Sequence, residues 1–196
     1  MGKPKPVIVV TGPSGAGKGT LERILVERMP ELELAVSATT RPQRRGEENG
    51  REYWFISGEE FERRVQAGEF LEWVPYVSGH RYGTLRSEIE RIHDSGRTPL
   101  LDLEIEGALA VRDQVEGSVT IFVDAPAFEE LERRLRERAT ESTGVIDERL
   151  ATARRQLELQ DQFDFVVRND VKQQAADDLA AIIARTLDGA ATMARP

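Results

Sequence analysis

Gly12-Pro13-Ser14-Gly15-Ala16-Gly17-Lys18-Gly19-Thr20 is the stretch that decides the fold. It follows the apolar run Val7-Ile8-Val9-Val10, which is typical of a buried parallel strand, and it precedes apolar residues at helical spacing that end near Met29. Small residues at a strand-to-helix turn let successive backbone N–H groups converge on phosphate oxygens, and Lys18 adds a positive charge for the outer phosphates. The stretch therefore predicts a phosphate-binding loop for a nucleoside triphosphate.

One position of this loop departs from the usual pattern. The residue after the lysine normally carries a hydroxyl group that binds Mg²⁺, but here it is Gly19, and the hydroxyl comes one place later on Thr20. We therefore expect Mg²⁺ to be held through water, with Thr20 and the acidic Asp102 anchoring some of the water molecules.

The composition limits the classes of protein to which the chain can belong. Its 196 residues, of which 39% are apolar, are enough for one or two small domains with a real core. We expect no membrane span and no secretory signal, because the apolar runs are too short, and the absence of cysteine excludes a disulfide framework. These features favour a cytoplasmic protein. The net charge of −8 argues against a nucleic-acid-binding surface, and the sequence does not indicate an oligomeric state.

The order of the predicted elements indicates an α/β protein with a three-layer αβα core around a parallel sheet. After the first strand, we expect the strands of this sheet at 34–36, 99–103, 119–123 and 165–167. We expect helices at 58–67, 85–93, 106–115, 128–138, 145–159 and 175–187, followed by a fraying tail at 188–196. Shorter strands with hairpin spacing at 53–56, 70–77 and 80–82 indicate a small mixed α+β domain inserted between the two halves of the core. Trp54 and Trp73 are expected to be core residues.

The boundaries follow from this order. We predict a core of residues 1–36 and 99–196, an insert of residues 37–98, and a helical lid at about 134–149 within the core. The segment 37–50 is too polar to pack a core, yet it is too rich in Ser, Thr and Arg to be only a spacer. Its arginines predict a site for a small anion, and a solvated surface loop is the alternative interpretation.

Two further groups of charged residues stand at predicted element ends. Asp102 ends a buried strand, where ligands of parallel sheets bind, and Glu104 shares its face if the strand continues; the alternative for Glu104 is a helix cap. Arg134 and Arg138 lie four residues apart on one helix, and Arg149 lies on the next. Arginines near a helix C-terminus are favoured in any case, but this arrangement also suits a lid that closes over phosphates.

Taken together, these motifs resemble those of guanylate kinases from about Pro6 to Leu187. The matching motifs are the loop itself, Val36-Ser37-Ala38-Thr39-Thr40-Arg41 with Arg44, Gly46-Glu47, Gly50 and Tyr53, the segment Phe70-Leu71-Glu72-Trp73, the segment Tyr82-Gly83-Thr84, and Asp102 with Glu106-Gly107. The resemblance implies a core, an inserted nucleoside-monophosphate domain and a lid, with Mg²⁺-dependent transfer of the ATP γ-phosphate to GMP.

The resemblance also implies a role for each matching residue. Residues 12–20 would hold ATP, with Asn169 against the adenine, and the residues that act on the phosphates during transfer would be Lys18, Arg41, Arg134, Arg138 and Arg149. The GMP phosphate would be held by Ser37, Arg41, Arg44, Tyr53 and Tyr82. The guanine edge would be read by Glu72, Thr84, Asp102 and Glu104. A carboxylate suits guanine, because N1–H and the N2 amine are two adjacent donors that adenine lacks.

The sequence departs from the family pattern at a few places, which keep two alternatives open. Gly19 replaces the usual hydroxyl residue, and Glu104 stands where the family more often has Asp. Glu137 and Ala139 replace glycines of the lid. The sequence Gly-Lys-Gly-Thr also occurs in adenylate and cytidylate kinases, although neither explains residues 37–53. A guanylate-kinase-like module that binds proteins without catalysis is the other alternative, which the intact loop and Lys18 disfavour.

Overall fold

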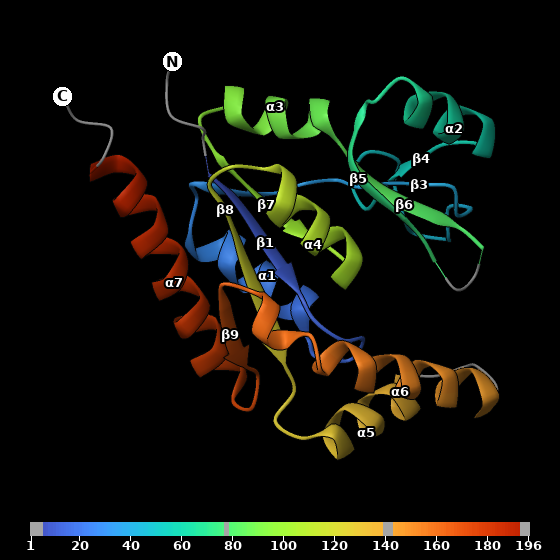
Figure 1. Cartoon of the computed structure of the whole chain (residues 1–196), viewed down its shortest axis with the longest axis vertical. Coiled ribbons are helices and arrows are strands. Elements are labelled where there is room, and N and C mark those ends of the chain that lie inside the picture. The colour runs from blue at the N-terminus through green and yellow to red at the C-terminus, as the bar shows by residue number, and fades with distance from the viewer. Residues whose placement is uncertain (1–5, 77–78, 139–142, 193–196) are drawn as a thin grey trace.

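The computed structural model describes residues 6–76, 79–138 and 143–192. Its core is a parallel sheet with helices on both faces (Figure 1). The five strands are β1 (Val7–Thr11), β2 (Leu32–Leu34), β7 (Thr98–Asp102), β8 (Ser118–Asp124) and β9 (Phe165–Arg168). Their order in the sheet is β2-β7-β1-β8-β9, and every neighbouring pair is parallel. The predicted three-layer core is confirmed, with the second strand slightly earlier in the chain than the expected 34–36.

Two layers of helices bury both faces of this sheet. Helices α1 (Lys18–Arg28) and α7 (Lys172–Thr192) cover one face. Helices α3 (Arg86–Asp94) and α4 (Ile105–Gln114) and the short 3₁₀ helix η1 (Gln160–Gln162) lie on the side of the other face. Because side chains alternate along a strand, the four apolar residues of β1 from Val7 to Val10 serve both layers, and the strand ends at the buried Thr11.

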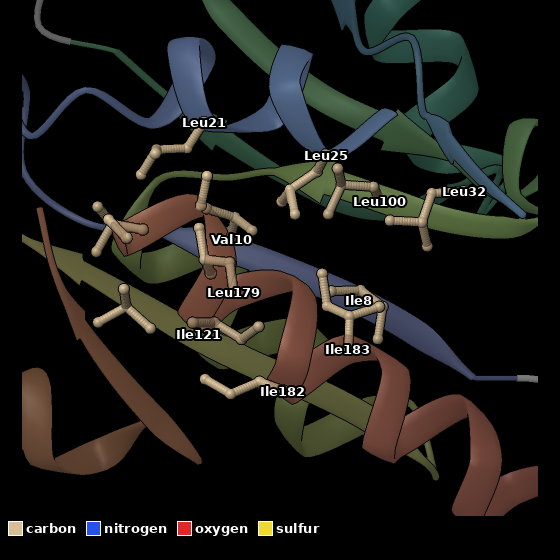
Figure 2. Packing of buried hydrophobic residues seen from close by; sticks show 14 of the residues in the cluster. Ile8, Val10, Leu21, Leu25, Leu32, Leu100, Ile121, Leu179, Ile182 and Ile183 are labelled. Atoms are coloured by element: carbon tan, nitrogen blue, oxygen red, sulfur yellow. The ribbon is translucent and has the colours of Figure 1, made fainter. Parts of the chain in front are cut away.

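Figure 2 shows the cluster on the first of these faces. Ile8 and Val10 of β1 contact the α1 and α7 layer, where Leu25 and Ile183 are fully buried. Val9, between them in sequence, belongs to the cluster on the opposite face. The phosphate-binding loop is thus anchored on a strand that is held from both sides.

A second, smaller sheet lies beside the core, as the hairpin spacing predicts. Its strands are β3 (Ala38–Thr39), β4 (Trp54–Phe55), β5 (Phe70–Pro75) and β6 (Arg81–Leu85), in the order β4-β3-β6-β5. The sheet is mixed, because β3 and β4 are parallel and the other pairs are antiparallel. Helix α2 (Gly58–Gln66) packs Phe61 against Phe70, with ring centroids 4.4 Å apart.

The contacts of this second sheet with the core bear on the predicted insert. Leu71 of β5 and Ile89 of α3 belong to the hydrophobic cluster of the core, together with Leu101 of β7. Helix α3 thus packs on the core rather than on α2, although it falls within the predicted insert. That residues 37–98 form one separate unit therefore stays a prediction.

The helical pair α5 (Phe128–Arg138) and α6 (Thr143–Leu157) lies at one end of the core (Figure 1). It has its own small cluster, in which Leu131 and Leu135 pack with Ile146 and Leu150. The predicted polar break at 139–144 falls mostly on residues outside the described part of the chain. A separate cluster is what a lid that moves as one body requires.

Several details of the sequence analysis are wrong. Ala38 and Thr39 of the polar segment form a strand and are buried, because two residues of a mainly polar run are enough to continue a small sheet. The predicted tail is helical as far as Thr192. Trp73 is 42% exposed, although its ring meets that of the buried Phe61 of α2 edge to face, with centroids 6.1 Å apart. In the described part of the chain, no helix is both long enough and apolar enough to cross a membrane.

Candidate active site

The phosphate-binding loop joins β1 to α1, and three of its glycines, Gly12, Gly15 and Gly17, have a positive φ; at Gly12 and Gly17 a side chain would also meet close neighbours. Gly12 has a φ of +137°, and a Cβ atom at this position would overlap the carbonyl oxygen of Val123. Gly17 has a φ of +95°, and a Cβ atom there would lie 2.5 Å from Nδ2 of Asn169. Side chains at these positions would therefore displace β8 or Asn169.

Two hollows open around this loop. The first, which we call the loop hollow, has a volume of about 430 Å³. It is lined by Pro13, Ser14, Gly15, Gly17, Lys18, Gly19, Thr20, Arg23, Asp102 and Glu104. Exposed N–H groups at a helix start and a lysine make this hollow suitable for phosphates.

The second hollow, which we call the cleft, lies between the loop and the second sheet and has a volume of about 390 Å³. It is lined by Lys18, Ser37, Arg41, Arg44, Glu47, Tyr53, Glu72, Val74, Tyr76, Tyr82, Gly83, Asp102, Leu103, Glu104 and Arg149. Lys18, Asp102 and Glu104 line both hollows. Ligands in the two hollows would therefore meet at these three side chains.

Lys18 is held at the junction by weak contacts. Its Nζ donates a hydrogen bond to the carbonyl oxygen of Gly12 at 2.9 Å and lies 3.8 Å from Oδ1 of Asp102. Asp102 is the last residue of β7, as predicted. A side chain bound in this way can turn toward a phosphate at little cost, because a long ion pair beside an open hollow contributes little stability.

Glu104 does not continue the strand, contrary to one expectation. β7 ends at Asp102, and Glu104 occupies the N-cap position of α4 without forming a side-chain cap. Burial raises the pKa of Glu104, while the positive charge of Lys18 lowers it. Its carboxyl group nevertheless lines both hollows, so the change of backbone does not remove it from the site.

The cations of the polar segment form one corner of the cleft. Arg41 is 9% exposed and binds both carboxylate oxygens of Glu47, at 2.8 and 3.1 Å. Glu47 also accepts a hydrogen bond from the backbone N–H of Arg44 at 2.7 Å. The guanidinium of Arg41 lies 5.4 Å from the centroid of the Tyr53 ring. The segment thus places two arginines at one corner of the cleft, and the carboxylate of Glu47 holds them in position.

Two tyrosines complete this corner. The rings of Tyr53 and Tyr82 meet edge to face, with centroids 5.6 Å apart. Burial raises the pKa of Tyr53 to about 12, so its phenol is neutral at physiological pH. A neutral phenol donates a hydrogen bond, which suits a phosphate oxygen.

Glu72 forms the opposite wall of the cleft. Its carboxylate is 6% exposed, and its Oε1 accepts a hydrogen bond from the backbone N–H of Thr84 at 2.8 Å. Burial raises the pKa of Glu72, and the bonds to Thr84 act against this. The antiparallel pairing of β5 and β6 places Glu72 opposite Thr84. One oxygen is thereby fixed by the backbone, while the residue lines the cleft.

Most of the predicted site residues come together in these hollows, and the exceptions are Gly12, Ala16, Thr84, Asn169, Arg134 and Arg138. Thr84 is fully buried behind Glu72, and Asn169 lines neither hollow. The Nδ2 of Asn169 donates to the carbonyl oxygen of Ala16 at 2.7 Å, so in this structure it braces the loop. Arg134 is near, with Nη1 3.4 Å from the carbonyl oxygen of Gly15. The side chain of Arg138 lies outside the described part.

Sequence reasoning missed several residues around the hollows. Tyr76 and Val74 line the cleft, and Arg23 lines the loop hollow. Glu22 is buried beside the loop. Burial and the negative charge of Asp102 raise the pKa of its carboxyl group, and the positive charge of Lys18 lowers it. A signal for Glu22 was available, because it lies one helical turn after Lys18 and therefore on the same face of α1.

The residues present fit a magnesium ion held mainly by phosphate oxygens. No group of three His, Cys, Asp or Glu side chains able to hold a metal occurs among the described residues. Asp102, Glu104 and the hydroxyl of Thr20 nevertheless place oxygen atoms around the loop hollow. Mg²⁺ prefers oxygen ligands and commonly keeps several waters when it binds with a nucleotide.

Comparison with known proteins agrees with this geometry. The family model for guanylate kinase matches residues 3–186. The guanylate kinase of Rubrobacter xylanophilus is 47% identical over 93% of this chain and 95% of its own. That of Symbiobacterium thermophilum is 45% identical over 97% of this chain and 92% of its own. The crystal structure of guanylate kinase from Anaplasma phagocytophilum superposes with a TM-score of 0.75 at 30% identity, covering 93% of this chain and 86% of the other.

Proposed function

The chain belongs to the guanylate kinase family and is an ATP:GMP phosphotransferase, and we propose that the loop hollow takes the ATP phosphates while the cleft takes GMP. The observation that supports this most strongly is the junction of the two hollows. Lys18, Asp102 and Glu104 line both, so a phosphate in the cleft and the terminal phosphate at the loop meet beside the same cation. Such an approach is what direct phosphoryl transfer requires.

On the ATP side, residues 12–20 supply backbone N–H groups and Lys18 supplies a charge for the β- and γ-phosphates. Asn169 braces the loop through Ala16, and its contact with adenine remains a prediction from the resemblance. Arg134 stands beside Gly15, and Arg149 reaches the cleft from α6. These arginines, together with Arg138, are proposed to clamp the transferring phosphate.

On the GMP side, the phosphate is proposed to bind in the corner made by Ser37, Arg41, Arg44, Tyr53 and Tyr82. The guanine base then lies toward Glu72, whose carboxylate accepts from N1–H and the N2 amine. Thr84 acts through its backbone N–H, which fixes Oε1 of Glu72. Because the carboxylate is buried, a base without both donors leaves it unpaired, and this penalty creates the selectivity.

No covalent nucleophile is needed for this reaction. Phosphoryl transfer between nucleotides depends on alignment of the two phosphates and on neutralisation of their charge, which Lys18 and the arginines provide. Mg²⁺, when bound with ATP, supplies further neutralisation of the β- and γ-phosphate oxygens. Asp102 and Thr20 are the residues proposed to hold it through water.

Closure of the insert and of the α5 and α6 pair would exclude water from the γ-phosphate. We therefore propose residues 37–98 and about 134–149 as the moving parts of the molecule. We also propose a cytoplasmic location, which the absence of cysteine favours.

A coupled assay of ADP release tests the assignment of the cleft. GMP, dGMP, CMP and AMP are supplied in turn with saturating Mg²⁺ and ATP. We expect turnover with GMP to exceed turnover with AMP and CMP by orders of magnitude. Comparable turnover with AMP or CMP would contradict the proposed reading of guanine by Glu72.

A further inference from the structure

Glu22 is a buried carboxyl group that the proposed roles leave unexplained. It lies on α1, one turn after Lys18, and its side chain is 2% exposed. Its Oε1 atom is enclosed and has no hydrogen-bond partner, and Glu22 forms no ion pair with any residue of the described ranges. Burial raises the pKa of Glu22 to about 8, and the negative charge of Asp102 adds to this effect.

Such a group is costly to the fold. A buried polar atom without a partner destabilises a protein by about 1–3 kcal/mol. Its neighbours on the buried face of α1 are Leu21 and Leu25, so an apolar side chain would suit the packing at position 22. The carboxyl group therefore has no evident role in stability.

The position of Glu22 relative to Gly19 indicates what the carboxyl group does. Gly19 lies in the first turn of α1, and a Cβ atom built on it would be 3.8 Å from Oε2 of Glu22. A hydroxyl group at position 19 would normally bind the metal. Glu22 thus places a carboxylate oxygen beside the site where the hydroxyl is missing.

We propose that Glu22 is a positioning residue that accepts a hydrogen bond from a water molecule on the nucleotide-bound Mg²⁺, in place of the contact that Gly19 lacks. Asp102, which lines the loop hollow, would hold another such water. The inference rests on the proposed use of Mg²⁺ with ATP. Oε2 of Glu22, the carboxylate oxygen that lies toward Gly19, is the atom that would accept this hydrogen bond.

Two variants of Glu22 test this inference through nucleotide binding, measured by calorimetry without GMP and therefore without turnover. ATP is titrated in excess Mg²⁺ and in excess chelator, and the ratio of the two affinities gives the enhancement by the metal. Glu22→Leu fills the same space without an acceptor, and Glu22→Gln keeps one neutral acceptor. Glu27→Gln is the matched control, because it makes the same substitution as Glu22→Gln at an exposed position on the same helix.

We expect Glu22→Leu to lower the enhancement by about tenfold, as for other outer-shell partners of metals, with Glu22→Gln in between. Affinity for metal-free ATP should be unchanged or higher, and resistance to urea should rise in Glu22→Leu. An enhancement equal to that of the wild type in Glu22→Leu would overturn the inference. If the wild type itself shows no enhancement, the proposed use of Mg²⁺ fails as well.

Restoring the hydroxyl tests the link with Gly19. In the double variant Gly19→Ser and Glu22→Leu, a serine at a helical position, where an added Cβ atom meets nothing closer than 3.8 Å in the wild type, regains a direct metal ligand. We expect the double variant to regain most of the Mg²⁺ enhancement of ATP affinity that Glu22→Leu loses. A double variant that responds to Mg²⁺ no better than Glu22→Leu would show that Glu22 does not replace the missing hydroxyl.

Discussion

Gly107 lies directly against the carboxylate of Glu72, so that a Cβ atom at position 107 would be 2.7 Å from Oε2 of Glu72. Gly107 is the third residue of α4, and Glu72 belongs to β5 of the second sheet. The absence of a side chain at this position of α4 therefore leaves room for the carboxylate that we propose to read guanine.

Gly107→Ala tests this relationship. We expect the methyl group to displace the carboxylate and to weaken GMP binding by about 1–3 kcal/mol, because the donors of guanine lose their acceptor. ATP binding should be unchanged. Gly189→Ala in α7, where a Cβ atom meets nothing within 4 Å, is the control for the effect of alanine in a helix. Titration of both nucleotides by calorimetry checks the expectation, and an unchanged GMP affinity would contradict it.

Glu72→Gln tests the chemistry at the same place. One acceptor becomes an amide that meets a donor of guanine, so kcat/KM for GMP should fall by an amount equivalent to about 1–3 kcal/mol or more. The affinity for ATP should remain nearly the same. Equal losses for ATP and GMP would show that Glu72 has a structural role only.

The stability of the ligand-free protein should depend on pH through Glu22. Burial raises the pKa of its carboxyl group from 4.5, the value for the unfolded chain, to about 8 in the folded protein. Between these values the folded state holds the additional proton, so raising the pH lowers the free energy of unfolding, by at most about 1.4 kcal/mol per pH unit. Urea unfolding at pH 6 and pH 8 measures this change.

Glu22→Gln isolates this effect, because every other group of the chain, including Lys18 and Asp102 beside position 22, is the same in both proteins. The decrease in the free energy of unfolding between pH 6 and pH 8 should be smaller in the variant than in the wild type. Equal decreases would mean that Glu22 is already ionised in the folded protein.

Lys18→Ala should abolish most turnover and preserve the fold. Among the described residues, its Nζ donates one hydrogen bond, to the carbonyl oxygen of Gly12, and forms one long ion pair, with Asp102, so little stability depends on it. We expect turnover to fall by several orders of magnitude, because the loop loses its only side-chain charge on the outer phosphates. Circular dichroism and the coupled assay measure the two effects. Substantial remaining activity would contradict the role assigned to the loop.

Binding of both nucleotides should close the molecule. The α5 and α6 pair has its own hydrophobic cluster, and the second sheet packs on the core through few elements. A bisubstrate mimic that joins adenosine to guanosine through phosphates should therefore reduce the radius of gyration in X-ray scattering. ATP alone should produce a smaller change. Identical scattering curves with and without the mimic would exclude closure.

The sequence by itself determined the elements and most of the ligand chemistry. The loop before Lys18, the apolar strand before it, and the motifs around Arg41 and Glu72 are local patterns, and local backbone preference and periodicity decide them. The parallel core sheet and the second sheet followed from the alternation of strands with helices and from hairpin spacing, whereas the order of the strands in the core sheet did not. The family followed from the same motifs.

Only the tertiary structure decided which of these residues act on one another. It placed Gly107 against Glu72, Asn169 under Ala16, and Glu22 beside Gly19, and it left Trp73 exposed. Each of these relationships, except that of Glu22 with Gly19, depends on packing between elements distant in the chain. Even for Glu22, helical spacing indicates the face of α1 but not its burial or its lack of a partner. Those depend on the surrounding side chains, which no local pattern specifies.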